Sequence, residues 1–329
     1  MAENKHAIAV NGLTKTYANK VRALDGLTLA VEAGSIFALL GPNGAGKSTT
    51  VKILTTLSRP NSGEARVAGM DVVREAQGVR RAIGCVAQKS GVDVESTGRE
   101  NLTLQGQFHG LRGADLKRRV AELLDRFSLI NAADRIAKTY SGGMQRKLDI
   151  AMALIHRPKV LFLDEPTTGL DPESRAELWD EIARVTAEGL TVLLTTHYLE
   201  EADRLAQRVA IVDRGRVVTE GSPEGLKAEL RGDSIQVELS AAASLEQVGE
   251  ALRGVPAVRD LQISGTLLHA RADQGATAVP GMLLALESQG MRVASVKVSR
   301  PTLDDVYLQY TGRTIEQAEQ AGVKQAVQQ

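Results

Sequence analysis

The most constraining feature of this sequence is a glycine-rich loop between an apolar strand and a helical stretch. It consists of Gly41, Pro42, Asn43, Gly44, Ala45, Gly46, Lys47, Ser48 and Thr49. The apolar run Ile36–Leu40 precedes it and the helical stretch Thr50–Leu57 follows. Glycines let such a loop fold so tightly that successive backbone N–H groups point inward, at the positive end of a helix dipole. The pattern therefore predicts a cradle for phosphate groups, with Lys47 facing the β- and γ-phosphates and Ser48 ligating Mg²⁺.

A pair of carboxylates follows a second buried strand. Val160–Leu163 is an uninterrupted apolar run, typical of a parallel sheet covered on both faces, and Asp164 and Glu165 come directly after it. Ligands of such sheets bind at the carboxyl ends of the strands. We therefore expect Asp164 to hold Mg²⁺ opposite the phosphate loop and Glu165 to orient or deprotonate an attacking water. Taken alone, such a pair can equally cap an element, so the phosphate loop is what favours the catalytic interpretation.

The chain changes character near residue 232. Up to about Leu230, short apolar strands alternate with helical patterns and glycine-rich turns, which predicts an α/β domain over residues 1–232. Two further strands are expected there, at Thr191–Thr195 and Val209–Val212. Turns between strands are expected at Ala30–Gly34 and Asp213–Gly215. Apolar residues three and four apart in Ala114–Phe127 predict a helix, within a helical insertion over about residues 91–158.

Residues 233–312 predict a small α+β module. Its expected strands and helices alternate as β-α-β-β-α-β, the order of a two-layer ferredoxin-like fold. They are Ile235–Leu239, Leu245–Leu252, Val258–Ile263, Leu267–Ala272, Ala278–Ser288 and Val293–Val298. A last helix, Leu303–Gln309, is expected to pack on this module. The polar, Gln-rich residues 313–329 predict a flexible tail.

Composition excludes several classes of protein. The 329 residues carry 40 Lys+Arg against 40 Asp+Glu, so no excess of positive charge points to nucleic acid. The single cysteine, Cys85, cannot form an intrachain disulfide. No apolar run approaches the ~18–20 residues that span a bilayer, and the first residues, MAENKHAIAV, lack the pattern of a secretory signal. We therefore expect a cytosolic chain that can rest on a membrane.

Four further motifs decide which family the sequence resembles. In chain order they are Gln88 after the strand Ile83–Ala87, Ser141-Gly142-Gly143 before a helical run, Asp171 in TTGLDP, and His197 after TVLLTT. Together with the phosphate loop and the acidic pair, they resemble the nucleotide-binding subunit of an ABC transporter over roughly residues 7–230. The resemblance implies a P-loop NTPase cassette with a parallel core sheet, an antiparallel β region and a helical insertion. It also implies ATP and Mg²⁺ as the bound ligands.

The resemblance assigns roles within one chain. Glu165 is expected to act as general base, and His197 to contact the γ-phosphate and tie it to Glu165. Gln88 is expected to contact Mg²⁺ or water and to sense a transmembrane partner. Tyr17 matches the aromatic residue that stacks on adenine, although an ordinary edge-strand aromatic residue remains the alternative.

The resemblance also implies a homodimer. Ser141, Gly142 and Gly143 match a signature that binds the γ-phosphate of ATP held by the opposite subunit, and a glycine-rich helix start supplies suitable N–H donors. Two chains packed head to tail would complete two sites, with Asp171 in the loop that contacts the partner. Tyr140 and Met144 replace the commonest residues of this signature, which leaves open any contact of the fifth position with the partner's nucleotide.

Two longer stretches of sequence resemble one subgroup of these nucleotide-binding subunits. TYSGGMQRKLDIA (139–151) and RPTLDDVYLQYTGR (300–313) resemble the daunorubicin/doxorubicin-resistance ATP-binding subunits, which energise export of hydrophobic antibiotics through a separate membrane permease. This implies a transport ATPase at the cytoplasmic face of a membrane. The alternatives are export of a lipid or glycan, or a non-transport ABC ATPase of translation, DNA repair or Fe–S assembly. A single cassette and the absence of a long heptad run count against the last class, and we expect no nucleic-acid partner.

Overall fold

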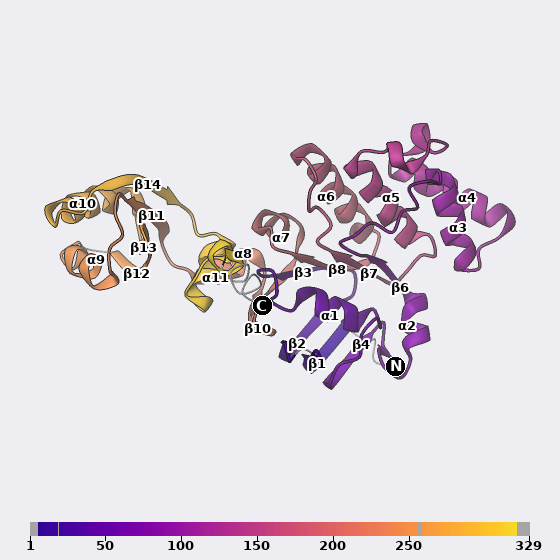
Figure 1. Ribbon diagram of the computed structural model, residues 1–329, viewed down its shortest axis with the longest axis horizontal. Helices are drawn as coiled ribbons and strands as arrows, with labels where there is room; N and C mark the ends of the chain where they lie inside the picture. The colour runs from indigo at the N-terminus through magenta and orange to yellow at the C-terminus, as the bar shows by residue number, and fades with distance from the viewer. Residues whose placement is uncertain (1–5, 19, 256–257, 321–329) are drawn as a thin grey trace. The chain divides into compact units, whose positions relative to one another are not determined.

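A six-stranded sheet carries the predicted phosphate loop at the end of one of its central strands (Figure 1). The computed structural model describes residues 6–18, 20–255 and 258–320. In spatial order the strands are β10 (Arg216–Gly221), β9 (Arg208–Asp213), β3 (Ile36–Leu40), β8 (Thr191–Thr196), β7 (Val160–Asp164) and β6 (Ile83–Val86). The five strands from β9 to β6 are parallel, and only β10 runs antiparallel to its neighbour. Every residue of β3, β7 and β8 is buried, which confirms the predicted parallel-sheet strands.

A second, antiparallel sheet covers one side of the first. Its order is β2 (Arg22–Glu32), β1 (His6–Thr16), β4 (Ser62–Val67) and β5 (Met70–Asp71). The predicted turn Ala30–Gly34 is wrong over its first three residues, since they pair with β1 as the end of β2. Val31 is fully buried there, so burial extends the strand, and the turn itself is Ala33-Gly34.

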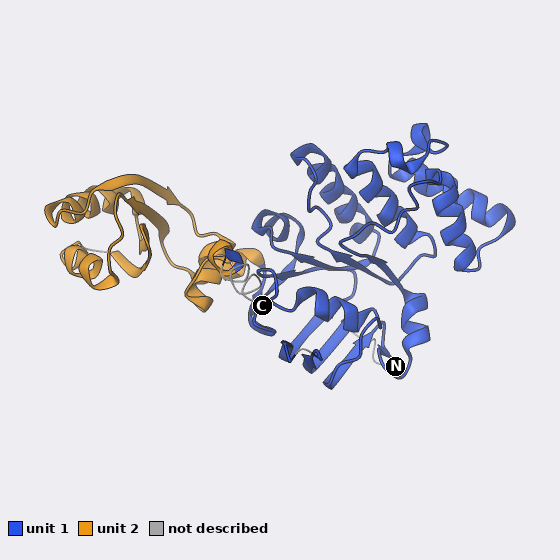
Figure 2. Cartoon of the chain, viewed as in Figure 1, with its two compact units in different colours: residues 1–222, 319–329 blue, residues 223–318 orange. Residues whose placement is uncertain are grey.

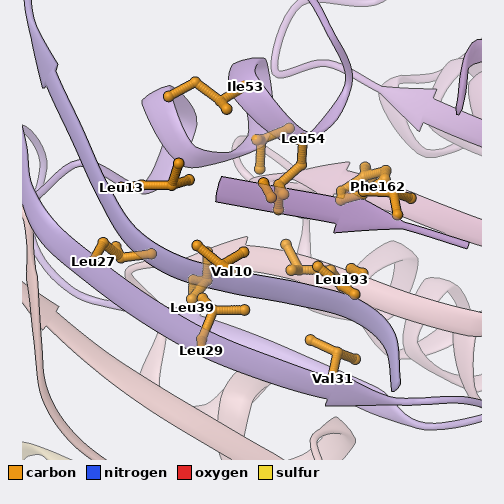
Figure 3. Close-up of a cluster of buried hydrophobic side chains, with 14 of the residues drawn as sticks. Val10, Leu13, Leu27, Leu29, Val31, Leu39, Ile53, Leu54, Phe162 and Leu193 are labelled. Carbon is orange, nitrogen blue, oxygen red and sulfur yellow. The ribbon is translucent and has the colours of Figure 1, made fainter. Parts of the chain in front are cut away.

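The core of this unit lies between the two sheets. Figure 3 shows side chains from β1, β2, β3, β7, β8 and α1 (Lys47–Leu54) meeting in one cluster. Leu13, Leu39 and Phe162 are each completely shielded from solvent. Burial of a leucine or phenylalanine side chain contributes about 1.5–3 kcal/mol. The cluster therefore fixes β3, β7 and α1 relative to one another, and with them the loops at the ends of β3 and β7.

Helices cover the other side of the parallel sheet, and those within residues 98–154 form the predicted insertion (Figure 1). They are α3 (Gly98–Phe108), α4 (Gly113–Arg126), α5 (Gly142–Leu154), α6 (Pro172–Ala187) and α7 (Leu199–Leu205), while the short α2 (Ala76–Ala82) precedes β6. The helix predicted at Ala114–Phe127 is α4, which buries one apolar stripe. None of the helices in the described part of the chain is long and apolar enough to cross a membrane.

The second compact unit spans Pro223–Ala318 (Figure 2). Its elements are α8 (Pro223–Glu229), β11 (Asp233–Leu239), α9 (Leu245–Leu252), β12 (Val258–Ser264), β13 (Leu267–Ala272), α10 (Gly275–Ser288), β14 (Val293–Ser299) and α11 (Leu303–Thr311). The sheet order β12-β13-β11-β14, antiparallel throughout, confirms the predicted ferredoxin-like arrangement. Apolar side chains of α9 and α10 pack on one face of this sheet.

The end of this unit differs from the prediction. The last helix, α11, packs against α8, and the Tyr310 hydroxyl donates to Glu229 Oε2 over 3.2 Å. It also contacts β11 through the hydrogen bond from Ser234 Oγ to Asp305 Oδ1 (2.7 Å). The unit therefore begins with α8, at Pro223, whereas the sequence placed the boundary after residue 232.

The predicted tail over 313–329 is wrong where the structure describes it. Residues 315–320 are helical, and Thr314 caps them by accepting the Gln317 backbone N–H over 3.2 Å. Ile315 and Ala318 are buried, which explains why this Gln-rich stretch is ordered. Residues 321–329, the rest of the expected tail, lie outside the described residues.

Candidate functional site

The phosphate loop joins the end of β3 to the start of α1 and is held at both ends. The Gly41 N–H donates to the Thr196 carbonyl at 3.3 Å, and the Gly215 N–H donates to the Ala45 carbonyl at 2.8 Å. Gly46 has a φ of +110°, and a Cβ there would lie 2.6 Å from the Ala23 carbonyl oxygen. Only glycine fits that position. No side chain caps the helix start at Gly46, so the first N–H groups of α1 stay available to an anion.

Lys47 is the first residue of α1 and its side chain is almost completely buried. Its Nζ donates to the carbonyls of Gly41 (2.6 Å) and Pro42 (3.1 Å), so the ammonium group lies across its own loop. The same Nζ is 3.7 Å from Glu165 Oε1. Burial lowers the pKa of Lys47, and the negative charge of Glu165 opposes that shift. The loop thus places a cation next to the predicted base.

Asp164, the last residue of β7, faces the start of α1. Its Oδ1 accepts hydrogen bonds from Ser48 Oγ (3.1 Å) and from Thr195 Oγ1 (2.5 Å) on the neighbouring strand β8. A carboxylate and a hydroxyl brought together in this way are the oxygen ligands that Mg²⁺ prefers. The residues present therefore fit a magnesium ion held between the phosphate loop and β7.

Glu165 meets three other predicted residues. Its Oε2 accepts from Gln88 Nε2 (3.1 Å), and its Oε1 lies 3.7 Å from Lys47 Nζ and 3.4 Å from His197 Nδ1. The His197 nitrogen has no well-aligned hydrogen-bond partner among the described residues, so we treat this contact as electrostatic. The interaction with His197 lowers the pKa of Glu165 most, and Lys47 lowers it further, against the effect of burial. The carboxylate is therefore ionised at neutral pH.

The backbone of Glu165 adopts an unusual conformation. Its φ is +48°, a left-handed value that costs a non-glycine residue about 1–3 kcal/mol. The Glu165 N–H is held by the backbone carbonyl and the hydroxyl oxygen of Thr195, both at 3.1 Å. Strain of this kind persists when the surroundings determine the geometry, and it turns the carboxylate toward Gln88, Lys47 and His197.

Tyr17 lies beside the same helix. Its hydroxyl is 3.3 Å from Thr49 Oγ1, and its side chain is partly open to solvent. Lys15 Nζ stands 5.3 Å from the ring centre. An aromatic ring in this position can offer a flat face next to the phosphate loop.

Ser141, Gly142, Gly143 and Asp171 form a second group. Ser141 caps α5, accepting the Met144 N–H at 3.2 Å, and Asp171 caps α6 through Ser174. The two helix starts touch, because a Cβ on Gly143 would lie 2.6 Å from Ser174 Oγ. Within the described residues, no hydrogen bond or ion pair joins the Ser141 or Asp171 side chains to Lys47 or Glu165. The predicted signature and the predicted catalytic cluster thus form two groups without a direct side-chain bond of this kind between them.

Sequence reasoning missed two residues of the site. Thr195 bonds both Asp164 and Glu165. Arg146, buried in α5, donates to backbone carbonyls on both sides of the cluster, including those of Ala87 and Pro166. The only sequence signal for Arg146 was a charged residue among the mostly apolar core-facing positions of α5, where Asp149 is the other buried charged residue.

Comparisons with known proteins agree with this geometry. Residues 24–168 match the family described as ABC transporter, and residues 221–311 match the ATP-binding protein DrrA1-3-like C-terminal domain. Over 307 residues the chain is 48% identical to the daunorubicin resistance ATP-binding protein DrrA3 of Streptomyces coeruleorubidus, covering 93% of this chain and 96% of that protein. This chain belongs to the ABC transporter ATP-binding proteins, with a DrrA-like C-terminal domain.

More distant members of the family extend the comparison. The Nod factor export ATP-binding protein I of Rhizobium sp. (strain N33) is 37% identical over 313 residues, covering 95% of this chain and 99% of that protein. A dimeric ATP-binding cassette in a post-hydrolysis state bound to ADP and Pi superimposes with a TM-score of 0.60 and 27% identity. It covers 65% of this chain and 98% of that one. The predicted P-loop ABC cassette is thereby confirmed, with the small C-terminal domain as its addition.

Proposed function

We propose that this chain binds and hydrolyses Mg-ATP to drive a drug exporter whose membrane permease is a separate subunit. The observation that carries the proposal is the cluster around Glu165, where an ionised carboxylate contacts Gln88, Lys47 and His197. In a family of ABC ATPases, this cluster is suited to activate water beside a nucleotide's γ-phosphate.

Glu165 would be the general base. Its lowered pKa keeps it unprotonated at neutral pH, so it can accept a proton from water. Gln88 would fix the orientation of the carboxylate, and His197 would contact the γ-phosphate from the other side. Each of these residues acts through a contact to Glu165 that is 3.4 Å or shorter.

Lys47 and the loop N–H groups would bind the phosphates. The ammonium group that now contacts the Gly41 and Pro42 carbonyls is the donor best placed to turn to the β- and γ-phosphates. Ser48 and Asp164, with Gln88 nearby, would hold Mg²⁺. That ion neutralises charge on the phosphate oxygens when bound. Tyr17 would stack on adenine.

A second copy of the chain would complete the site. In the part of the chain that the structure describes, no hydrogen bond or ion pair joins the side chain of Ser141 to Lys47 or Glu165, which suits a signature meant for a partner's nucleotide. Asp171 caps the neighbouring helix and would lie in the same interface. We propose a head-to-tail homodimer with two ATP molecules between the copies.

A groove in the first unit would receive the permease. It has a volume of about 470 Å³ and is lined by Cys85 and Ala87 of the β6 region, by Gln105 of α3 and by Met152 of α5. Leu57 in its wall is 73% exposed. Phe108, which precedes the wall residue His109 in sequence, is 77% exposed. Exposed apolar side chains of this kind suit a helix from a membrane subunit. Because the groove reaches Lys89 and Gly91, an occupant would touch the residues next to Gln88. The chain would thus act at the cytoplasmic face of the membrane.

Export of hydrophobic antibiotics of the daunorubicin/doxorubicin class is the proposed task. It is supported by 48% identity to a daunorubicin resistance protein across nearly the full length and by the matching C-terminal domain. Export of a lipid or glycan is the second candidate, favoured by the 37% identity to a Nod factor export protein.

The test uses this chain expressed with a candidate permease from the same genome. We expect the two to co-purify from membranes, to hydrolyse Mg-ATP and to lower the accumulation of doxorubicin in cells. The matched control carries Glu165→Gln in the same pair and should lose efflux. Co-purification with ribosomes or DNA in place of a membrane protein would contradict a transport role. ATP-dependent export without any effect on doxorubicin would leave the lipid or glycan candidate.

A further inference from the structure

Two charged side chains are buried on one turn of α5, the helix that begins with the signature. Arg146 and Asp149 lie three residues apart and are each 7% exposed. Arg146 Nη1 is 3.8 Å from Asp149 Oδ2. Buried charges need partners, and here most of those partners are backbone groups of the two loops that carry Gln88 and Glu165.

Arg146 holds the loop after β7. Its Nε donates to the Pro166 carbonyl (2.8 Å), and its Nη2 donates to the carbonyls of Asp164 (3.1 Å) and Glu165 (3.3 Å). Three successive carbonyls thus point to one guanidinium group. Together with the hydrogen bonds from the Glu165 N–H to Thr195, this arrangement maintains the left-handed backbone of Glu165. A planar fork of donors is needed for this geometry, which lysine lacks.

The same turn of α5 holds both ends of the segment with Gln88. Arg146 Nη1 donates to the Ala87 carbonyl at 2.7 Å, directly before Gln88. Asp149 Oδ1 accepts the Gly91 N–H at 2.9 Å, three residues after Gln88. The segment between these two anchors is short, so it moves with α5.

We propose that Arg146 and Asp149, here called the α5 clip, are positioning residues that keep Gln88 and Glu165 aligned and tie both to the signature helix. The inference rests on the proposed function, because it concerns the alignment of the proposed base. A displacement at the permease groove, whose wall includes Gly91 and Asp149, would pass through the clip to the loop of Glu165. A displacement of the signature at the start of α5 would also reach the loop of Glu165 through the clip.

The test compares Arg146→Gln, Arg146→Lys and Asp149→Asn with the matched control Lys147→Gln. Lys147 is on the same helix but pairs with Glu177 of α6, away from both loops. Misplacement of a catalytic group by about 1 Å costs on the order of 100-fold in rate. We expect Arg146→Gln to lower kcat by about 10–100-fold, with the Kd of a fluorescent ATP analogue nearly unchanged. Arg146→Lys should recover part of that loss, and Asp149→Asn should have a smaller effect because its oxygen still accepts the Gly91 N–H.

Hydrogen exchange supplies the second measurement, which does not depend on turnover. Amides of residues 88–91 should exchange faster in Arg146→Gln, with a smaller increase in Asp149→Asn, and should exchange in Lys147→Gln as they do in the unsubstituted chain. Unchanged kcat and exchange in a folded Arg146→Gln chain would overturn the clip while leaving the ATPase assignment intact. A lower kcat accompanied by weaker ATP binding and a lower melting temperature would also overturn the clip, since these three changes together indicate a general loss of structure. An unsubstituted chain that does not hydrolyse Mg-ATP in the presence of its permease would contradict the proposed function. Hydrogen exchange would still show whether Arg146 and Asp149 hold residues 88–91 in place.

Discussion

Gln88 Nε2 donates a hydrogen bond of 3.1 Å to Glu165 Oε2, joining the loop after β6 to the loop after β7. The two strands are parallel neighbours, so their carboxyl ends deliver both side chains to the same edge of the sheet. The other carboxylate oxygen of Glu165 faces Lys47 and His197. Any change at Gln88 therefore reaches the proposed base directly, without an intervening residue.

Replacement of Lys47 tests the phosphate loop. Lys47→Ala deletes the only charge that the loop itself presents, so ATP binding should weaken and hydrolysis should be lost. The control is Lys52→Ala, an exposed lysine one turn further along α1, which should bind and hydrolyse ATP as the unsubstituted chain does. Titration with a fluorescent ATP analogue and a phosphate-release assay measure the two effects. Near-normal turnover by Lys47→Ala would count against the site.

Replacement of Glu165 separates binding from chemistry. Glu165→Gln keeps the size of the side chain but removes the proton acceptor, so kcat should fall by ~10²–10⁴-fold if general-base catalysis is lost. ATP binding should persist, and an ATP-bound dimer should accumulate in size-exclusion chromatography. Glu173→Gln, on the exposed first turn of α6, is the matched control. A Glu165→Gln chain with ordinary turnover would remove Glu165 from that role.

The predicted residues that the structure brings together in one site include several whose neighbours in sequence fix their position. Lys47 and Ser48 follow a loop whose glycines determine the backbone, and Asp164 ends a strand that the core cluster holds in place. The β-α-β-β-α-β order of the second unit likewise determines its sheet order. In these cases local sequence and tertiary structure specify the same arrangement.

The features missed depend on contacts between distant segments. Thr195 looks like an ordinary strand residue. Arg146 donates to backbone carbonyl groups, which every residue has, so the sequence does not indicate which residues are its partners. The helix at 315–320 has a polar sequence, and only burial of Ile315 and Ala318 reveals its order. Such long-range partners cannot be deduced from periodicity or spacing.

The titration of Glu165 tests the contact with His197. Because the folded-state pKa is lowered, Glu165 contributes stability above its unfolded pKa, and that stability is lost as pH falls through the folded value. His197→Ala removes the largest cause of the shift, so the carboxyl should titrate at a higher pH. Carboxyl-carbon NMR of the labelled protein measures this, with Glu165→Gln identifying the resonance. An unmoved titration in His197→Ala would show that the contact is too weak to matter.

Replacement of Ser141 tests the second copy. Ser141→Arg puts a long cation at the exposed start of α5, so it should block dimer-dependent turnover while single chains still bind nucleotide. The Hill coefficient for ATP hydrolysis should fall toward one in what activity remains. Ser288→Arg, at an exposed helix end of the second unit, controls for the added bulk and charge. Unchanged cooperativity in Ser141→Arg would contradict the head-to-tail arrangement.

The fit of the phosphate loop against β2 can be tested with two glycines of the same loop. Gly44 and Gly46 both have positive φ values, +82° and +110°, so alanine at either should cost about 1–2 kcal/mol of backbone strain. They differ in space: a Cβ on Gly44 would meet nothing within 4 Å, whereas one on Gly46 would lie 2.6 Å from the Ala23 carbonyl oxygen and 2.9 Å from Leu24 Cδ2. The Ala23 carbonyl is part of the backbone of β2 and cannot move aside as a flexible side chain can. The added methyl group of Gly46→Ala must therefore push the loop away from β2. Its melting temperature should therefore fall further than that of Gly44→Ala. Equal melting temperatures for the two variants would mean that strain alone, and not contact with Ala23, makes glycine necessary at residue 46.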